Sequence, residues 1–270
     1  MAEPAALSEV DTSTAGLAVS LRGVTKVYDS GVMALGPLDP DVSRAEFVSL
    51  LGPSGCGKST ALRLIAGLSA PTSGTVLVSH RAAQARRGHS IGFVFQEPTL
   101  MPWTSVRGNV RLPLKLAHTP KAEASARVDE ALAQVGLSEF ADAYPRELSG
   151  GMKMRVSLAR ALVTDPDILL MDEPFAALDE ITRFRLNNDL IALWRNLKKT
   201  VIFVTHSVFE SVYLSQRVVV MTPRPGRVSA EIRIDAVEPR GEDFRTSAEY
   251  AGYCREVSHA LAPSYSGRPV

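Results

Sequence analysis

The sequence predicts an α/β fold in which a mostly parallel sheet is built around a helical insertion and joined to a strand-rich N-terminal part. Short, continuous apolar runs such as Phe47–Leu51 and Ile168–Asp172 are typical of buried parallel strands, because helices cover both faces of such strands. Segments of helical period separate these runs along the chain. Leu17–Val27 instead alternates loosely between apolar and polar residues, which favours antiparallel strands near the N-terminus.

The elements follow one another in the order that such a fold requires. Phe47–Leu51 leads into glycines and then into Ser59–Leu68, whose apolar residues recur at helical spacing. After a strand at Ile91–Gln96 the pattern is helical for about sixty residues. Further strands are predicted at Thr75–Val78, Val201–Thr205, Arg217–Met221 and Val228–Ile234, and a long helix at Ile181–Asn196. This order predicts a sheet that is interrupted and then resumed.

These patterns divide the chain into regions. Residues 1–16 are acidic and rich in Ala, Ser and Thr, and we interpret them as a flexible N-terminal tail rather than a signal peptide. Residues 17–234 form the predicted α/β domain, with the helical subdomain at about 97–163. Residues 235–270 are interpreted as a peripheral C-terminal helix and tail.

Composition and charge exclude several classes of protein. A chain of 270 residues with 45% hydrophobic and 22% charged residues is globular and can bury a sizeable core. Its net charge of +1 gives no electrostatic reason to expect nucleic acid as a partner. No apolar run approaches the roughly 20 residues that span a bilayer. The two cysteines, Cys56 and Cys254, do not suggest a disulfide framework, so the cytoplasm is the expected compartment.

A glycine-rich loop lies between the strand at Phe47–Leu51 and the helix that follows it. The loop matches the P-loop pattern at every fixed position, and comprises Gly52, Pro53, Ser54, Gly55, Cys56, Gly57, Lys58, Ser59 and Thr60. Glycines let backbone N–H groups and a helix N-terminus surround phosphates, while Lys58 reaches the terminal phosphates and Ser59 binds Mg²⁺. The alternative is a chance glycine-rich turn, which the two flanking elements disfavour.

Two carboxylates end the apolar strand at Ile168–Asp172. Asp172 and Glu173 are therefore expected at the carboxyl edge of a parallel sheet, where ligands of open α/β folds bind. In that position Asp172 can hold Mg²⁺ through water and Glu173 can polarise an attacking water molecule. The alternative is a pair of solvated acids at a strand end, but a phosphate loop in the same sheet favours the functional interpretation.

A second candidate phosphate site precedes an amphipathic helix. Ser149 can cap that helix, and Gly150 and Gly151 leave its first-turn N–H groups open to an anion. With this motif the sequence resembles the ABC ATPase family, whose signature sequence in one subunit closes over the ATP held by the P-loop of another. Met152 stands where that family usually has Gln, which puts a role for this side chain in doubt.

The resemblance extends over about residues 17–234 and implies further site residues. Tyr28 matches the aromatic residue that stacks on adenine, and Gln96 the glutamine that senses Mg²⁺ and the attacking water. His206 matches the histidine near the γ-phosphate, and Asp179 belongs to the loop that couples the two sites of a dimer. Each residue also has a simpler interpretation: half-buried packing for Tyr28, a solvated loop for Gln96, a hydrogen-bonded histidine, and a helix cap for Asp179.

The segment from Gln96 to Trp103 joins that glutamine to an apolar stretch stiffened by prolines. The resemblance implies that this segment receives a membrane-embedded permease, and Leu100, Met101 and Trp103 suit the core of an interface. Alternatively, these side chains pack inside the helical subdomain. The segment and the sequence at residues 218–227 look like those of ATPases from nitrate, sulfonate, taurine and pyrimidine-precursor importers.

Together these patterns imply an α/β P-loop ATPase with an antiparallel β subdomain and an inserted helical subdomain. It is expected to bind ATP and Mg²⁺, to form an ATP-dependent homodimer, and to drive a separate permease served by a solute-binding protein. Its expected location is the cytoplasmic face of the inner membrane, as a peripheral subunit. Two alternatives remain open: an ABC ATPase of DNA repair or the ribosome, and an exporter subunit. The first usually has a coiled coil or a second cassette, and the chain shows neither.

Overall fold

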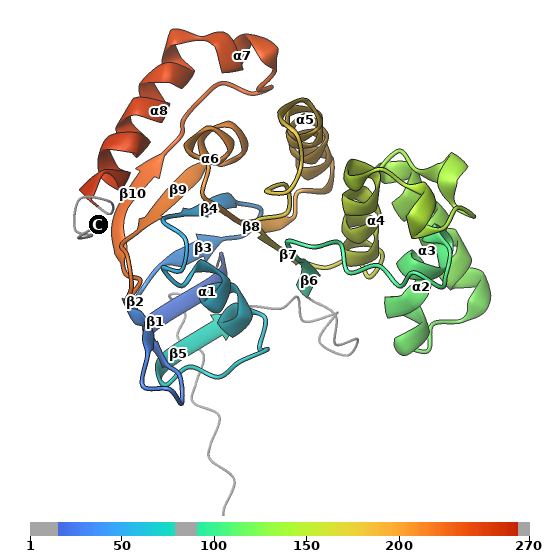
Figure 1. The fold of residues 1–270 in the computed structure, drawn as a ribbon, viewed down its shortest axis with the longest axis horizontal. Coiled ribbons are helices and arrows are strands. Elements are labelled where there is room, and N and C mark those ends of the chain that lie inside the picture. Colours follow the sequence, from blue (N-terminus) through green and yellow to red (C-terminus); the bar gives the residue numbers. More distant parts are fainter. Residues whose placement is uncertain (1–15, 79–90, 264–270) are drawn as a thin grey trace, which may run out of the picture.

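The computed structural model describes residues 16–78 and 91–263. Except for Gly16, the expected N-terminal tail at residues 1–16 lies outside the described residues, as does the tail at 264–270. Within the described ranges the chain forms two sheets with helices packed around them (Figure 1). The predicted α/β fold class is therefore confirmed.

The larger sheet has the strand order β10-β9-β4-β8-β7-β6, and all of its neighbouring strands are parallel except β10 and β9. Its strands are β4 (Phe47–Leu51), β6 (Ile91–Val94), β7 (Ile168–Asp172), β8 (Thr200–Thr205), β9 (Arg217–Met221) and β10 (Val228–Arg233). In β4, Phe47 and Leu51 join one hydrophobic cluster, whereas Val48 and Leu50 join another on the opposite face. The continuous apolar runs thus reflect a sheet that is covered on both sides.

The smaller sheet is antiparallel and forms the N-terminal β subdomain. Its strands are β1 (Leu17–Val27), β2 (Met33–Leu38), β3 (Asp41–Ser43) and β5 (Ser73–Val78), and β1 pairs with each of the others. The sequence did not predict β2 or β3. Gly36 and Pro37 give β2 the composition of a turn, and β3 is too short to show a period.

Helices cover the faces of the larger sheet. They are α1 (Lys58–Ile65), α5 (Glu180–Leu197), α6 (Val208–Leu214) and α8 (Ala248–Leu261), and the short helix α7 (Glu242–Thr246) packs against α8. Figure 1 shows α1 beside β1 and β5, whereas α5, α6 and α8 lie on the other side of the sheet. Among the described residues, none of the helices combines the length and the apolar character needed to span a bilayer.

The helical subdomain is inserted between β6 and β7, as predicted. It contains α2 (Val106–Leu116), α3 (Lys121–Gln134) and α4 (Gly150–Leu162), with two 3₁₀ turns at Ser138–Phe140 and Pro145–Glu147. Buried residues such as Val110, Leu114, Val128 and Leu132 form its interior. In Figure 1 these helices lie together beyond β6, the edge strand of the sheet.

A buried arginine fastens the C-terminal segment to the end of α6. The side chain of Arg240 donates hydrogen bonds to the carbonyl oxygens of Val212, Tyr213 and Ser215 at 3.2, 3.2 and 2.6 Å, and to that of Ile234 at 3.1 Å. Only 4% of Arg240 is exposed. Because the last carbonyls of a helix have no partner within the helix, the guanidinium satisfies groups that would otherwise be buried and unpaired.

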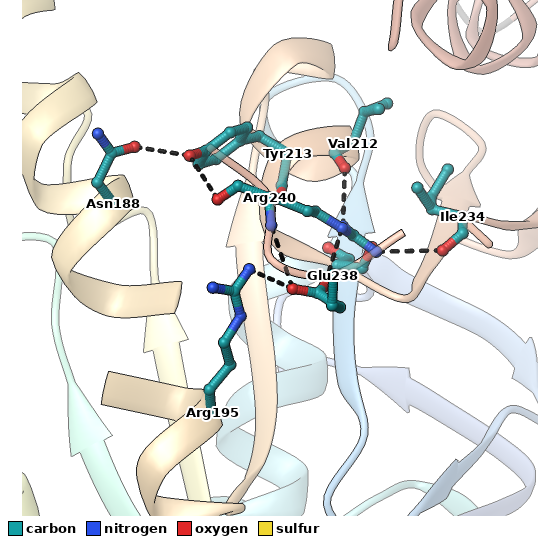
Figure 2. A network of polar contacts seen from close by, with 8 residues as sticks. Asn188, Arg195, Val212, Tyr213, Ile234, Glu238 and Arg240 are labelled. Carbon is teal, nitrogen blue, oxygen red and sulfur yellow. Dashed lines mark hydrogen bonds and ion pairs between the residues drawn. The ribbon is translucent and has the colours of Figure 1, made fainter. Parts of the chain in front are cut away.

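The polar network extends from Arg240 to α5 (Figure 2). Glu238 forms ion pairs with Arg240, at 3.1 Å, and with Arg195 of α5. The hydroxyl group of Tyr213 donates a hydrogen bond of 2.7 Å to the side chain of Asn188, also in α5. The segment that follows β10 therefore ties α5 and α6 together.

Replacing Arg240 with Met is expected to lower the free energy of unfolding by about 2 to 4 kcal/mol, because several buried carbonyls lose their hydrogen-bond donor and Glu238 keeps only its ion pair with Arg195. Urea unfolding followed by circular dichroism measures the change. Arg255→Met is the matched control, since Arg255 is exposed on α8. Equal midpoints for the two variants would mean that the Arg240 contacts contribute nothing to stability.

Candidate nucleotide-binding and catalytic site

The ends of four parallel strands meet at one edge of the larger sheet. Leu51 at the end of β4 pairs with Thr205 at the end of β8, Asp172 at the end of β7 pairs with the residue before Thr205, and β6 ends opposite Met171. The glycine-rich loop, the two carboxylates, the histidine and the glutamine predicted from the sequence all lie at these strand ends or within two residues after them. The structure therefore brings these segments to one edge, where ligands of such sheets bind.

The glycine-rich loop has the backbone of a phosphate cradle. Gly55 and Gly57 have φ angles of +75° and +109°, a region that side chains disfavour. A Cβ atom on Gly57 would lie 2.5 Å from Cδ2 of Leu35 and 2.8 Å from the carbonyl oxygen of Ala34. Gly57 precedes α1 without a side-chain cap. The first N–H groups of α1 consequently remain available to an anion.

The ammonium group of Lys58 lies inside this loop. It donates hydrogen bonds to the carbonyl oxygens of Gly52 at 2.8 Å and Pro53 at 3.0 Å, and it lies 3.7 Å from Oε1 of Glu173. Lys58 is only 4% exposed. A buried positive charge surrounded by carbonyls and one carboxylate is well placed to exchange these contacts for phosphate oxygens.

Ser59 and Asp172 form a pair of oxygen ligands suited to a divalent cation. The hydroxyl of Ser59 donates a hydrogen bond of 2.8 Å to Oδ1 of Asp172. Burial raises the pKa of Asp172, while the hydrogen bond from Ser59 opposes that shift. A partly buried carboxylate whose charged form is disfavoured gains from a nearby cation, and Mg²⁺ typically takes one or two protein oxygens together with phosphates and water. The residues present therefore fit Mg²⁺.

Glu173 and His206 contact each other across the strand ends. Oε2 of Glu173 lies 2.9 Å from Nδ1 of His206, and the backbone N–H of Glu173 donates to Val204 at 3.0 Å. Glu173 has a φ angle of +45°, an uncommon conformation for a residue with a side chain and one often found at functional sites. The side chain of His206 is 51% exposed, compared with 18% for Glu173.

The sequence did not predict Glu210, which holds the backbone beside His206. Oε2 of Glu210 accepts a hydrogen bond of 2.6 Å from Thr205, whose hydroxyl accepts one of 3.0 Å from the N–H of Ser207. Burial raises the pKa of Glu210, and the hydrogen bond from Thr205 opposes the rise. Ser207 and Glu210 have the spacing of a helix capping box, so the local pattern suggested only a helix start.

Tyr28 and Gln96 lie at the margins of the site. The hydroxyl of Tyr28 is hydrogen-bonded to that of Thr60 at 3.1 Å, and Tyr28 is 40% exposed. Nζ of Lys26 lies 5.6 Å from the centre of its ring. An accessible aromatic ring next to the phosphate loop suits an adenine base. Gln96 is exposed and follows the end of β6 by two residues.

The second glycine motif lies at the start of α4, in the helical subdomain. Oγ of Ser149 accepts a hydrogen bond of 3.3 Å from the N–H of Met152, so Ser149 caps the helix as expected. Gly150 and Gly151 are its first residues, and a Cβ atom on Gly151 would lie 2.8 Å from Cγ2 of Thr182 in α5. Figure 1 shows α4 well separated from α1, which begins with Lys58.

Asp179 caps α5. Its Oδ1 accepts a hydrogen bond of 2.9 Å from the N–H of Thr182, and this bond lowers the pKa of Asp179. The simpler interpretation of Asp179 as a helix cap is therefore confirmed. A role in coupling two sites stays a prediction.

Comparison with known proteins decides the family. The family model described as ABC transporter matches residues 35–176, which is more than half of the chain. The chain belongs to the ABC transporter family. A taurine import ATP-binding protein of Rhizobium johnstonii is 49% identical over 87% of this chain and 91% of its own length. A nitrate import ATP-binding protein of Synechocystis is 43% identical over 85% of this chain and 88% of its own length.

A solved structure extends the comparison to the fold. A dimeric ATP-binding cassette in a post-hydrolysis state, bound to ADP and phosphate, matches with a TM-score of 0.69 at 35% identity. The match covers 81% of this chain and 100% of that one. The resemblance drawn from the sequence is thus confirmed, and this ABC protein is an ATP-binding ATPase with the predicted architecture.

In this ABC protein the segment from Gln96 to Trp103 leaves its most apolar residue in solvent. Trp103 is 76% exposed, so the alternative in which it packs inside the helical subdomain is wrong. Leu100 is partly buried against the main hydrophobic cluster. The segment therefore divides its apolar residues between the core and the surface.

Two side chains attach the same segment to the helical subdomain of the ABC protein. Arg160 of α4 donates hydrogen bonds of 2.8 Å to the carbonyl oxygens of Pro98 and Thr99. Asn109 of α2 is fully buried, and its amide group accepts from the N–H of Met101 at 2.8 Å and donates to the carbonyl of Met101 at 3.1 Å. The segment is consequently fixed to α2 and α4 rather than free in solvent.

Gly57→Ala is expected to weaken nucleotide binding by roughly tenfold or more, because the new Cβ atom adds backbone strain and a steric clash with Leu35. Titration of the isolated chain with a fluorescent ADP analogue measures the affinity. Gly67→Ala is the control: Gly67 has a φ angle of +69° but open space around its Cβ position. If both variants bind ADP equally well, the geometry of the loop at Gly57 is not required.

Proposed function

We propose that this ABC ATPase is the energy-supplying subunit of an importer for a small solute and hydrolyses Mg²⁺-ATP with Glu173 as the general base. The catalytic part of this proposal rests on one observation. Lys58, the Ser59–Asp172 pair and the Glu173–His206 pair all lie at one edge of the sheet. A phosphate-binding lysine, a pair of metal ligands and a base are the parts that phosphoryl transfer to water requires.

Nucleotide binding uses the loop and its surroundings. The phosphates take the N–H groups of the loop and of the first turn of α1, and Lys58 exchanges its carbonyl partners for phosphate oxygens. Tyr28 stacks on the adenine. Ser59 and Asp172 hold Mg²⁺, with Gln96 beside them, and the bound ion neutralises charge on the phosphate oxygens.

In the hydrolytic step a water oxygen attacks the γ-phosphorus while the bond to the bridging oxygen breaks, giving ADP and phosphate. Glu173 accepts the proton that the water loses. Its Oε2 is hydrogen-bonded to His206, which orients the carboxylate and adjoins the γ-phosphate. The Glu210–Thr205 contact fixes the backbone from which His206 projects.

A second copy of the chain completes the site. The Ser149–Gly151 motif starts α4 in the helical subdomain, whereas Lys58 starts α1 beside the β subdomain. In a head-to-tail dimer the helix N-terminus at Ser149 of one copy meets the phosphates held by the other. Asp179 then lies near the junction of the two sites. The solved cassette that resembles this chain is itself dimeric.

The remaining partners belong to the transport system. The exposed Trp103 and the segment that begins at Gln96 dock the permease, and a solute-binding protein delivers the solute without contacting this chain. The ATPase then acts as a peripheral protein on the cytoplasmic face of the inner membrane. Relatives named for taurine and nitrate import favour a small anionic or zwitterionic solute. They also favour an importer over an exporter or a DNA-repair ATPase.

Glu173→Gln is expected to keep ATP binding and to slow hydrolysis by roughly 10² to 10⁴, because the amide cannot accept the proton. Release of inorganic phosphate measures turnover, and size-exclusion chromatography with ATP should reveal a trapped dimer. Glu256→Gln, an exposed substitution on α8, serves as the control. A Glu173 variant with normal turnover would rule out this base.

Trp103→Ala is expected to remove about 1 to 4 kcal/mol of docking energy while leaving the isolated subunit stable, since the side chain is exposed. Solute uptake in reconstituted vesicles and stimulation of hydrolysis by the permease should fall together. Leu116→Ala is a matched control, because Leu116 is 69% exposed at the end of α2. Unchanged uptake in the Trp103 variant would argue against docking at this residue.

A further inference from the structure

The turn between β9 and β10 lies against the phosphate loop. Nε and a terminal nitrogen of Arg224 each donate a hydrogen bond of 3.2 Å to the carbonyl oxygen of Gly55. Two residues further on, Gly226 packs so closely that a Cβ atom there would overlap the carbonyl oxygen of Cys56. The turn therefore contacts the carbonyl groups of two successive residues in the loop.

The turn is itself held in place. The N–H of Thr222 donates to the carbonyl of Arg227 at 2.9 Å, and the hydroxyl of Thr222 donates to the carbonyl of Pro225 at 3.2 Å. Gly226 is also bonded to β2 of the β subdomain, because its N–H donates to the carbonyl of Ala34 at 3.0 Å and its own carbonyl accepts from the N–H of Gly36 at 2.9 Å. The backbone of the turn that carries Arg224 is therefore held by hydrogen bonds on both sides.

Lys58 and Arg224 hold different parts of the loop. Lys58 binds the carbonyls of Gly52 and Pro53, and these are the contacts that it gives up to phosphate oxygens. The contact of Arg224 with Gly55 needs no such exchange. Since the C=O and N–H of one peptide unit point in opposite directions, fixing the carbonyl of Gly55 also fixes the amide of Cys56 within the loop.

We propose that Arg224 is a positioning residue for the phosphates of ATP and ADP, which acts by holding the Gly55 peptide unit of the phosphate loop in its binding conformation. The proposal rests on the proposed phosphate site and adds to it a residue outside the P-loop. It also gives a physical role to part of the sequence at residues 218–227, which resembles that of ATPases from certain importers.

A neighbouring arginine provides a matched control. Arg227 is exposed and lies three residues further along the same turn, but its side chain packs over Gly36 of β2, where Nε would lie 2.5 Å from an added Cβ atom. Arg227→Ala removes the same charge from the same turn without touching the contact with Gly55. Arg224→Lys keeps the positive charge but cannot donate two hydrogen bonds from a planar group to the carbonyl oxygen of Gly55.

The first measurement uses the full chain without nucleotide. Hydrogen exchange of the peptide that spans the loop reports how firmly the loop is held. Arg224→Ala should raise exchange in this peptide, Arg224→Lys should raise it less, and Arg227→Ala should leave it unchanged. A residue that acts only by contacting phosphate would not alter exchange in the absence of nucleotide.

The second measurement is the affinity for a fluorescent ADP analogue. Arg224→Ala should weaken binding by about 3- to 10-fold, the usual net contribution of an ordinary hydrogen bond, because Arg224 is exposed and water competes for its charge. Arg224→Lys should recover part of the loss. The reference is Lys58→Ala: if it binds ADP normally, the phosphate site itself is wrong. Weaker binding by Arg224→Ala without faster exchange would make Arg224 a direct phosphate ligand and overturn the positioning role. Unchanged binding with unchanged exchange would overturn it as well.

Discussion

The register of the parallel strands is the constraint on which the site depends. β4, β8 and β7 pair in a fixed parallel register, so Gly52 and His206 leave the sheet at the same level and Glu173 leaves it one residue earlier, level with Thr205. Both faces of these strands are buried in separate hydrophobic clusters, and a slip of one residue would exchange the two sets of side chains. Core packing therefore fixes where the reacting groups lie, although none of those groups contributes to the core.

Much of this arrangement could be predicted from the sequence because its signals are local. The strand, glycine loop and helix around Lys58 are contiguous, and the acids at Asp172 and Glu173 directly follow an apolar run. Contacts between distant segments could not be predicted in the same way. The partners of Arg240 and Arg224 lie in other elements, and the carboxylate of Glu210 turns from its own helix start toward Thr205.

The segment from Gln96 to Trp103 joins the sheet edge to the helical subdomain, and most of its contacts are with the subdomain. Arg160 and Asn109 hold the residues after Gln96 through backbone carbonyls and amides, and Arg160 also donates a hydrogen bond to the hydroxyl of Thr99. A displacement of α2 and α4 would consequently carry the segment with them. Trp103 would then move with these helices, while Gln96 lies two residues after β6, so the segment links an exposed surface to the edge of the catalytic site.

The position of Arg240 also bears on how the protein is made. α6 begins two residues after His206, and its last carbonyls bind a guanidinium that the chain supplies only after β10. During synthesis from the N-terminus, the phosphate loop leaves the ribosome long before this arginine does. The helix that follows His206 therefore lacks these last hydrogen bonds until Arg240 has emerged, so the site acquires this support only after the segment beyond β10 has been synthesised.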